Sequence, residues 1–240
     1  MRYLITVSYD GSKFFGFQKL NNEKSVQKEL ENALTKINKS QVYVKGSGRT
    51  DRGVHALGQR CHFDLDIDIA PERLLNAINS LLNDYIYVKD CIVVDKDFHS
   101  RFFVKEKTYK YIINIGEYDA IKNDYIYNYC HKLNVSRMIE ASKYLIGKHN
   151  YHVFVSGERD NYNSEIYNIE FEEINDYIVI KFIGKSFYRY MVRNLVGALM
   201  LVGKNKISLD EFKTMIDSDE TKYTYITVPA SGLYLESVKY

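Results

Sequence analysis

The stretch Ser25-Val26-Gln27-Lys28-Glu29-Leu30-Glu31-Asn32-Ala33-Leu34-Thr35-Lys36-Ile37 sets the pattern of the first half of the chain. Its apolar residues recur at the spacing of one helix face, and Ser25 is suited to cap the first turn. They are Val26, Leu30, Ala33, Leu34 and Ile37. The stretch therefore predicts an amphipathic helix on the surface of a folded core.

Strand patterns lie on both sides of this helix. Tyr3–Tyr9 is rich in β-branched and aromatic residues and runs into the turn signal Asp10-Gly11. Pro71 opens a second apolar-periodic helix. Further strands are predicted at Val42–Lys45, Gln59–Leu65 and Tyr85–Val94. The order β-α-β-β-α-β is the split βαβ pattern, in which two helices cover one face of an antiparallel sheet and the other face stays open to a ligand.

The second half repeats this order loosely. Strands are predicted at Thr108–Ile115, Ile166–Ile174, Tyr177–Ile183 and Leu233–Val238, and helices at Ser136–Leu145, at Tyr188–Val202 and after the capping box Ser208-x-x-Glu211. We expect an α+β protein with two split-βαβ (ferredoxin- or RRM-like) domains, 1–104 and 105–240. Edge-to-edge joining of their sheets into one mixed, mainly antiparallel sheet would hide two edges. Helices would cover one face, and a cleft would form on the other.

Composition excludes several classes of protein. Of the 240 residues 45% are hydrophobic and 27% charged, which is ordinary for a globular protein. No run approaches the roughly 18 apolar residues of a membrane span, so we expect a cytoplasmic protein.

The three cysteines form no C-x-x-C pair, which favours buried thiols over a zinc site. A net charge of +2 does not indicate nucleic-acid binding, and the 22 tyrosines are read as a compositional bias.

The loop Gly46–Ala56 carries the densest chemistry. Three glycines permit close approach of a substrate, and Asp51 lies between Arg49 and Arg52 with His55 nearby. A carboxylate flanked by cations is held ionised, which suits nucleophilic or electrostatic work more than acid catalysis. The alternative is a solvated turn in which Asp51 pairs with a neighbouring arginine.

Five blocks of sequence resemble the TruA family of tRNA pseudouridine synthases. The first two are Tyr9-Asp10-Gly11 with Phe15-Gly16-Phe17-Gln18, and the string Gly-Arg-Thr-Asp-Arg-Gly-Val-His-Ala that contains Asp51. The others follow in the family's order: Phe98–Phe102 with Lys107–Tyr111, Phe187–Gly197, and Pro229–Leu233. The resemblance spans nearly the whole chain and implies that the expected cleft is an RNA-binding cleft.

The resemblance implies a role for each matching residue. Asp51 would be the catalytic aspartate, Arg49 would help to flip the target nucleotide, and Tyr109 would stack on the base and assist loss of the proton from carbon 5. Arg193 would pair with Asp51, and Leu233 would close the pocket. The isomerisation needs no metal or organic cofactor. The alternatives are an ordinary strand aromatic for Tyr109, a solvated helix charge for Arg193 and a core leucine for Leu233.

Other cations are candidates for contacts with RNA. Arg189 and Arg193, four residues apart, are expected on one helix face as a basic surface. Arg52 and Lys107 are candidate RNA contacts, and Lys105, Lys110, Lys181 and Lys185 could also meet phosphates. His55 is interpreted as a loop-shaping residue, and His99 receives no chemical role.

Four departures from the family pattern leave the exact RNA open. They are Phe17 in place of tryptophan, Asn83 in place of proline, Asn150 in place of aspartate and Glu165 near an expected arginine. The resemblance implies a homodimer acting on uridines of the tRNA anticodon stem-loop, at positions 38, 39 and 40. Alternatives are a paralogue acting on another tRNA site or on ribosomal RNA, a silent RNA-binding protein, and a hydrolase, which would need a second carboxylate that the sequence does not offer.

Overall fold

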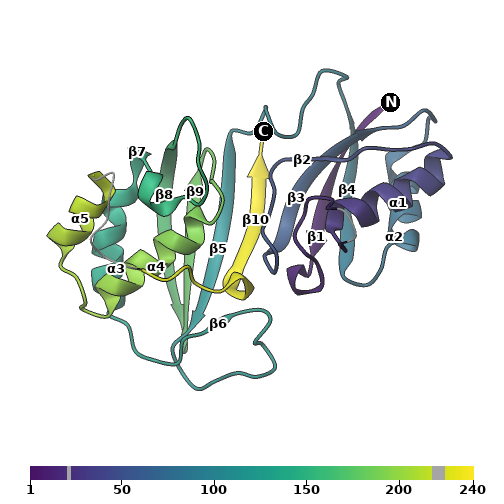
Figure 1. Ribbon diagram of the computed structural model, residues 1–240. Coiled ribbons are helices and arrows are strands. Elements are labelled where there is room, and N and C mark those ends of the chain that lie inside the picture. Colours follow the sequence, from purple (N-terminus) through teal and green to yellow (C-terminus); the bar gives the residue numbers. More distant parts are fainter. Residues whose placement is uncertain (21–22, 218–224) are drawn as a thin grey trace. The chain divides into compact units, whose positions relative to one another are not determined.

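The computed structural model describes residues 1–20, 23–217 and 225–240, and the chain divides into two compact units (Figure 1). Unit 1 contains Met1–Lys105 and Tyr234–Tyr240, and unit 2 contains Glu106–Leu233. The predicted second half, 105–240, differs from unit 2 in its last strand. Strand β10 (Leu233–Lys239) pairs in parallel with β3 (His55–Asp64), so the last seven residues group with unit 1.

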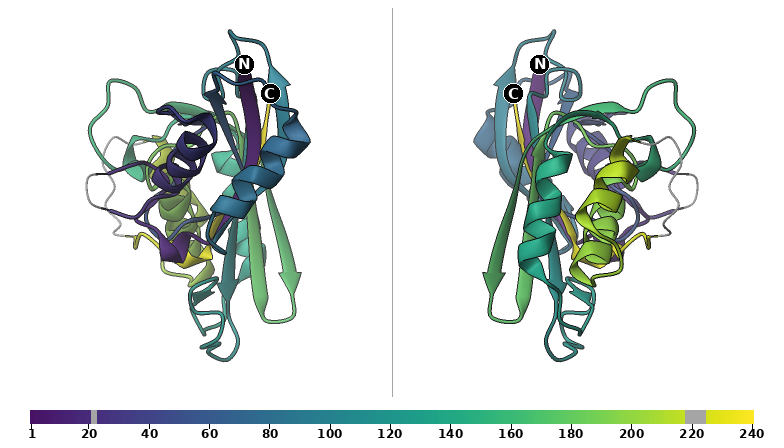
Figure 2. Two further views of the ribbon diagram at one scale, coloured as in Figure 1. Left: turned by 90° about the vertical axis from the view of Figure 1, so that its right-hand side faces the viewer. Right: turned by 90° about the vertical axis from the view of Figure 1, so that its left-hand side faces the viewer.

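The sheet of unit 1 has the predicted split βαβ order. Strand β1 (Arg2–Tyr9) lies between β3 and β4 (Ile86–Val94) and is antiparallel to both. The short β2 (Lys45–Gly46) pairs with β3. Helix α1 (Val26–Asn38) connects β1 to β2, and α2 (Pro71–Leu81), which connects β3 to β4, packs on β4 and on α1 (Figure 2).

The predicted helix signals place both helices correctly. The Ser25 hydroxyl accepts a hydrogen bond from the Lys28 amide at 3.4 Å and caps α1. Val26, Leu30, Ala33 and Leu34 are buried as expected, whereas Ile37 is half-buried. Pro71 occupies the first turn of α2, where its missing amide hydrogen costs nothing.

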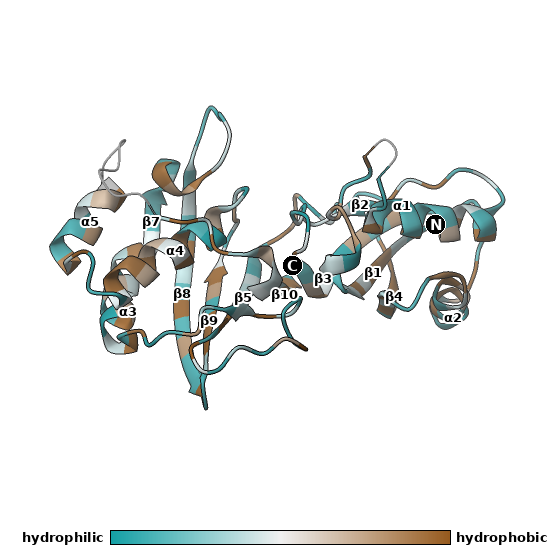
Figure 3. Cartoon of the chain, turned by 60° about the horizontal axis from the view of Figure 1, so that its bottom comes forward, coloured by the Kyte–Doolittle hydropathy of each residue, from teal (hydrophilic) through white to brown (hydrophobic). Residues whose placement is uncertain are grey.

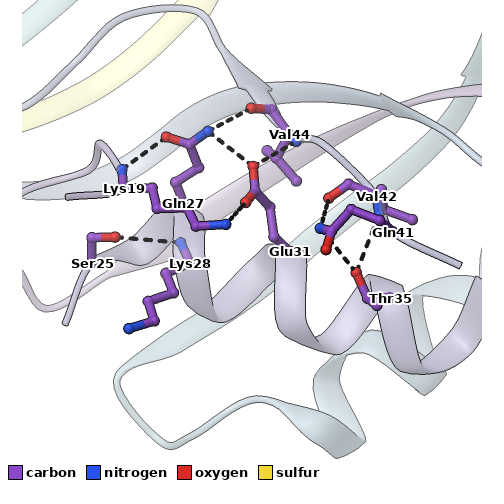
Figure 4. Close-up of polar contacts among 9 residues, drawn as sticks. All are labelled: Lys19, Ser25, Gln27, Lys28, Glu31, Thr35, Gln41, Val42 and Val44. Carbon is purple, nitrogen blue, oxygen red and sulfur yellow. Dashed lines mark hydrogen bonds and ion pairs between the residues drawn. The ribbon is translucent and has the colours of Figure 1, made fainter. Parts of the chain in front are cut away.

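The strand predicted at Val42–Lys45 is present only in part, because the β2 ladder contains Lys45 and Gly46 but not Val42–Val44. Side chains of α1 bind this backbone in place of a neighbouring strand (Figure 4). The Val42 amide donates to Thr35 Oγ1 at 3.2 Å, and Gln27 Nε2 donates to the Val44 carbonyl at 3.0 Å. Such contacts between residues far apart in sequence leave no periodic signal.

Glu31 is the centre of this attachment. Its carboxylate, with a side chain only 2% exposed, accepts hydrogen bonds from Lys19 Nζ at 3.0 Å, Gln27 Nε2 at 3.0 Å and the Val44 amide at 3.1 Å (Figure 4). A buried carboxylate is tolerated when charge and hydrogen bonds compensate its desolvation. Glu31 therefore fixes the chain just before the loop that begins at Gly46.

Unit 2 has an antiparallel sheet in the order β5-β9-β8-β7. The strands are β5 (Glu106–Asn114), β9 (Tyr177–Gly184), β8 (Asn163–Ile174) and β7 (Gly147–Asn150), and β6 (Tyr127–Asn128) pairs in parallel with β5. Helices α3 (Val135–Ser142), α4 (Met191–Gly203) and α5 (Leu209–Asp217) pack together. The α+β class is confirmed, and edge-to-edge joining of the two sheets stays a prediction.

Helix α4 is the buried helix of unit 2. Almost all of its residues are buried, and its apolar residues appear brown in Figure 3. It begins at Met191 and not at the predicted Tyr188. Tyr190 has a left-handed φ of 62°, which a residue inside a right-handed helix does not adopt.

The Ser208–Glu211 capping box of α5 is confirmed, with reciprocal hydrogen bonds of 2.7 and 3.2 Å. In the described part of the chain, no helix is long and apolar enough to cross a membrane.

Replacement of Glu31 by alanine tests the attachment of Val44. We expect Glu31→Ala to lower the free energy of unfolding by about 2–4 kcal/mol, because the buried Val44 amide loses its acceptor. Urea denaturation measures this loss, with the exposed Lys36→Ala in the same helix as the control. Equal stability of the two variants would contradict the assigned role.

Candidate active site

The loop Gly46–Ala56 begins on a buried polar clamp. The Ser47 amide donates to the Arg60 carbonyl at 2.7 Å, and the Ser47 hydroxyl donates to Gln59 Oε1 at 2.6 Å. Gln59 Nε2 in turn donates to the Gly48 carbonyl at 3.0 Å. Because Gln59 belongs to β3, the outgoing strand holds the first residues of the loop.

Thr50, directly before Asp51, is held from two sides. Its hydroxyl is hydrogen-bonded to the buried Tyr9 hydroxyl at 2.8 Å, and its carbonyl accepts the Phe17 amide at 3.2 Å. The Asp51 carbonyl then accepts the Val54 amide at 3.1 Å across a turn in which Gly53 has a φ of 81°. Asp51 is half-buried on this turn, so its carboxylate is carried by a constrained backbone.

The segment Gly11–Phe17 lies against the loop so closely that glycine is required. A Cβ at Gly11 would lie 2.0 Å from the Val54 carbonyl oxygen. A Cβ at Gly16, whose φ is 98°, would lie 2.7 Å from the Thr50 carbonyl oxygen. The two motifs that the sequence singled out, Tyr9-Asp10-Gly11 and Phe15-Gly16-Phe17, therefore form the support of the Asp51 loop.

The cations and the histidine of the loop have different environments. Arg49 and Arg52 are exposed, and the Arg52 guanidinium lies over the Phe15 ring at 4.2 Å from its centroid. His55 is buried, accepts the Gly11 amide on Nδ1 at 3.1 Å and stacks on Tyr234 at 4.7 Å. His55 thus shapes the loop, as predicted, while the arginines face solvent.

Tyr109 of unit 2 lies on β5. The residue is 8% exposed, and its ring meets Phe187 edge-on, with centroids 5.2 Å apart. Lys107, two residues earlier on the same strand, shares its face of the sheet and is also buried. Lys107 is therefore less exposed than Arg49 and Arg52 of the loop.

Arg193 is tied into unit 2 by its guanidinium. Nε donates to the Val228 carbonyl at 2.7 Å, and Cζ lies 5.0 Å from the centroid of the Tyr190 ring. Arg189 lies over the same ring at 4.9 Å. The prediction that Arg189 and Arg193 share a helix face is wrong, because Arg189 precedes the first residue of α4. Both guanidinium groups instead contact the ring of Tyr190.

A buried tyrosine that the sequence did not single out binds the segment before β10. The Tyr111 hydroxyl donates to the Pro229 carbonyl at 2.7 Å. Burial raises the pKa of Tyr111, against an opposing effect of the positive charge on Arg193. Leu233, buried, follows Gly232, where a Cβ would lie 2.8 Å from the Tyr111 ring. Tyr111, Arg193 and the chain from Val228 to Leu233 thus form one cluster within unit 2.

Comparison with known proteins identifies the family. A family model described as tRNA pseudouridine synthase matches residues 5–102 and 141–240. The chain belongs to the tRNA pseudouridine synthase family. The suspected resemblance is therefore confirmed, and the family is one of isomerases. Asp51, Arg193 and Leu233 lie within the matched residues, whereas Tyr109 lies outside them.

Relatives named tRNA pseudouridine synthase A match over their full length. The protein of Finegoldia magna is 41% identical, over 98% of this chain and 98% of its own. Those of Thermosipho melanesiensis and Bacillus subtilis are 38% and 39% identical, over 99% and 100% of this chain and 98% and 99% of their own. A solved Cbf5-Nop10-Gar1 complex matches with a TM-score of 0.37 and 10% identity, over 82% of this chain and 54% of that chain, too little to support an argument.

The departures from the pseudouridine synthase pattern have local structural roles. The buried Phe17 ring lies so near Gly46 that a Cβ there would meet it at 2.5 Å. Asn83 Oδ1 accepts the Tyr85 amide at 3.0 Å, and Asn150 Oδ1 accepts the His152 amide at 3.0 Å, so both side chains close turns. Glu165 is half-buried on β8, opposite Lys148.

The predicted site residues thus fall into two groups. Arg49, Asp51 and Arg52 share the loop of unit 1, and the others belong to unit 2, namely Lys107, Tyr109, Arg189, Arg193 and Leu233. Within the described ranges no group of three or more histidine, cysteine, aspartate or glutamate residues could hold a metal ion.

A pair of glycine variants tests the close support of the loop. Gly16 and Gly157 both have left-handed backbones, but a Cβ at Gly157 would meet nothing within 4 Å. We expect Gly157→Ala to cost about 1 kcal/mol of stability from backbone strain alone. Gly16→Ala should cost at least about 2 kcal/mol and also lower turnover, because the Thr50 carbonyl must move.

The two variants are compared by thermal unfolding and by the initial rate of pseudouridine formation. A Gly16→Ala protein as stable and as active as Gly157→Ala would contradict the close approach.

Proposed function

We propose that this protein converts uridine to pseudouridine in the anticodon stem-loop of tRNA, at positions 38, 39 and 40, with Asp51 as the catalytic carboxylate. The observation that carries the proposal is the constrained turn at Asp51. The family model matches nearly the whole first unit, and this turn lies within the match. Thr50 on one side and the hydrogen bond from Val54 on the other limit the positions that the Asp51 carboxylate can occupy. Such preorganisation is what a catalytic group needs.

The reaction is an isomerisation in which the atoms balance without any added reagent. The bond between C1′ of ribose and N1 of uracil breaks, the base turns, and a bond forms between C1′ and C5. The proton on C5 is lost and N1 gains a proton. Asp51 assists breakage of the first bond, either by covalent attack or by stabilising positive charge on the sugar.

The other site residues act around this centre. Arg49, exposed on the same loop, helps to hold the target nucleotide out of the stack. Tyr109 contacts the base and assists proton loss from C5. Arg193 pairs with Asp51, and its contact with Val228 occupies only one of its several N–H donors. Leu233 closes the pocket with an apolar surface.

Further cations of the proposed site contact the RNA backbone. Arg52 and Arg189 are exposed, and each is positioned by an aromatic ring, Phe15 and Tyr190 respectively. Lys107 is a weaker candidate because it is buried. Cations of this kind fix the register of an RNA without reading its sequence.

Two features of the proposal concern the state of the protein in the cell. We propose a homodimer that binds one tRNA with both subunits, and a location in the cytoplasm. Both rest on the resemblance of the chain to its family. Light scattering of the purified protein with and without tRNA tests the first of them.

The proposal is tested by mapping pseudouridine on unmodified tRNA transcripts and ribosomal RNA fragments. We expect the wild type to modify the anticodon stem-loop, and Asp51→Asn and Asp51→Ala to lose at least about 10³-fold in rate, as loss of a catalytic nucleophile does. Asp68→Asn, at an exposed aspartate of the same unit, is the control and should keep the wild-type rate.

Each outcome of this mapping experiment identifies either the catalytic residue or the RNA that is modified. Pseudouridine at another tRNA position or in ribosomal RNA would identify a paralogue with a different target. Full activity in Asp51→Asn would refute the catalytic role of Asp51. Tight binding of tRNA without any pseudouridine would leave a silent RNA-binding protein, and release of free uracil would indicate a hydrolase.

A further inference from the structure

The segment Phe98–Phe103, which follows β4 in unit 1, exposes two large aromatic side chains. Phe102 is 74% exposed and Phe103 is 49% exposed. The neighbouring Phe98 is half-buried between Phe103 and Tyr240, at centroid distances of 5.6 and 4.9 Å. Large aromatic surface in water is unfavourable, so its presence on an ordered segment points to a ligand.

The exposed ring of Phe102 is one half of a stacked pair. Its centroid lies 4.2 Å from that of His99, with an angle of 27° between the planes. His99 in turn meets the buried His62 edge-on at 4.7 Å. One face of Phe102 is therefore supported by the protein, while most of its surface remains open to a further flat ring.

The pair is held in place by contacts of the buried Ser100. The Ser100 amide donates to His62 Nδ1 at 3.2 Å, and its hydroxyl donates to the Lys45 carbonyl at 2.7 Å. The Tyr240 hydroxyl donates to the Ser100 carbonyl at 2.8 Å. Because a backbone N–H can only donate, His62 Nδ1 accepts and the imidazole is neutral, in accord with burial that lowers the pKa of His62 to about 4.

Two further hydrogen bonds fix the turn that carries the aromatic rings. His99 Nδ1 accepts the Arg101 amide at 3.1 Å, and the His99 carbonyl accepts the Phe103 amide at 3.2 Å. A surface fixed before binding loses little conformational entropy when a ligand arrives. The exposed aromatic pair is thus preorganised.

Three cationic side chains lie near this aromatic pair. The pKa of His99 is lowered, first by partial burial and then by the positive charges of Arg2, Lys45 and Arg101. Arg2 is neutralised by an ion pair with Asp64 at 2.8 Å. Lys45 and Arg101 are exposed, and no carboxylate of the described residues lies within 4.0 Å of either cation. Positive charge beside an exposed flat ring is the combination that single-stranded nucleic acid requires.

The position of the aromatic pair connects it to the proposed catalytic loop. Lys45, whose carbonyl accepts the Ser100 hydroxyl, is followed directly by Gly46, the first residue of the loop that carries Asp51. A nucleotide on Phe102 would therefore belong to the same RNA as the target uridine, outside the nucleotide that reacts. This placement favours RNA over an unrelated protein partner as the occupant.

We propose that Phe102, supported by His99, is a stacking platform for an unpaired nucleobase of the RNA substrate, with Lys45 and Arg101 contacting the adjacent phosphates. The inference rests on the proposed function and deepens it, since it assigns a contact that binds substrate outside the reacting uridine. Stacking of a base on an aromatic ring is sequence-tolerant, so the platform would serve tRNAs with different loop sequences.

The test compares four side chains at Phe102 in the full-length protein. We measure KM and kcat on an unmodified tRNA transcript for the wild type, Phe102→Trp, Phe102→Leu and Phe102→Ala. Loss of one stacked base should raise KM about 5- to 150-fold in Phe102→Ala, with kcat changed much less. Phe102→Trp should remain within about twofold of the wild type, because it keeps the flat ring.

Phe102→Leu distinguishes stacking from a merely apolar contact. Leucine keeps an apolar surface but has no π face, so we expect its KM to resemble that of Phe102→Ala. A wild-type KM in Phe102→Leu with a raised KM in Phe102→Ala would indicate an apolar contact and overturn the platform. A wild-type KM in Phe102→Ala would overturn it outright. Ile121→Ala, at a 91% exposed side chain of unit 2, is the control and should change nothing.

A binding measurement separates this inference from the proposed reaction. Fluorescence anisotropy of labelled tRNA needs no turnover, so it is carried out on the same variants even if the wild type forms no pseudouridine. Weaker binding by Phe102→Ala and Phe102→Leu with wild-type binding by Phe102→Trp would support the platform in either case. Lys45→Gln and Arg101→Gln should each reduce the dependence of log Kd on log salt by about 0.7, and an unchanged slope would remove the cations from the platform.

Discussion

The hydrogen bonds to Thr50 are the constraint on which the candidate site depends. The Tyr9 hydroxyl at the end of β1 and the Phe17 amide both bind the residue before Asp51. Because neither partner belongs to the loop, the position of Asp51 is set by elements that precede it by more than thirty residues. Gly11 and Gly16 follow from this constraint, since any larger residue would push the supporting segment away from the loop.

The same supporting segment positions the helix of the first unit. The Gly16 carbonyl accepts the Val26 amide at 3.3 Å, and the Phe17 carbonyl accepts the Gln27 amide at 2.9 Å, so α1 begins on the segment that holds Thr50. Glu31 of α1 then binds Val44, just before the loop. The loop is thus held before its start at Val44, at its centre at Thr50 and at its end by the hydrogen bond from the Gly11 amide to His55. These contacts let it carry exposed arginines without losing its shape.

Much of this architecture could be predicted from the sequence, because the signals are local. The period of α1 with its Ser25 cap, the β-branched and aromatic content of β1, and the Ser208–Glu211 capping box each depend on residues close together in sequence. What could not be predicted depends on contacts between distant residues or on a backbone conformation that leaves no sequence signal. The shortness of β2 follows from Glu31 and Gln27, and the start of α4 follows from the left-handed backbone of Tyr190. The role of Tyr111 depends on Pro229, far along the chain.

The central claim is that the Thr50 contacts position Asp51 for catalysis, and kcat of Thr50→Val measures it most directly. Valine keeps the shape of threonine but cannot bond the Tyr9 hydroxyl, whereas Thr50→Ser keeps the hydroxyl. We expect kcat to fall at least about tenfold in Thr50→Val, with KM nearly unchanged and with Thr50→Ser near the wild type. A folded Thr50→Val protein with the wild-type kcat would contradict the account.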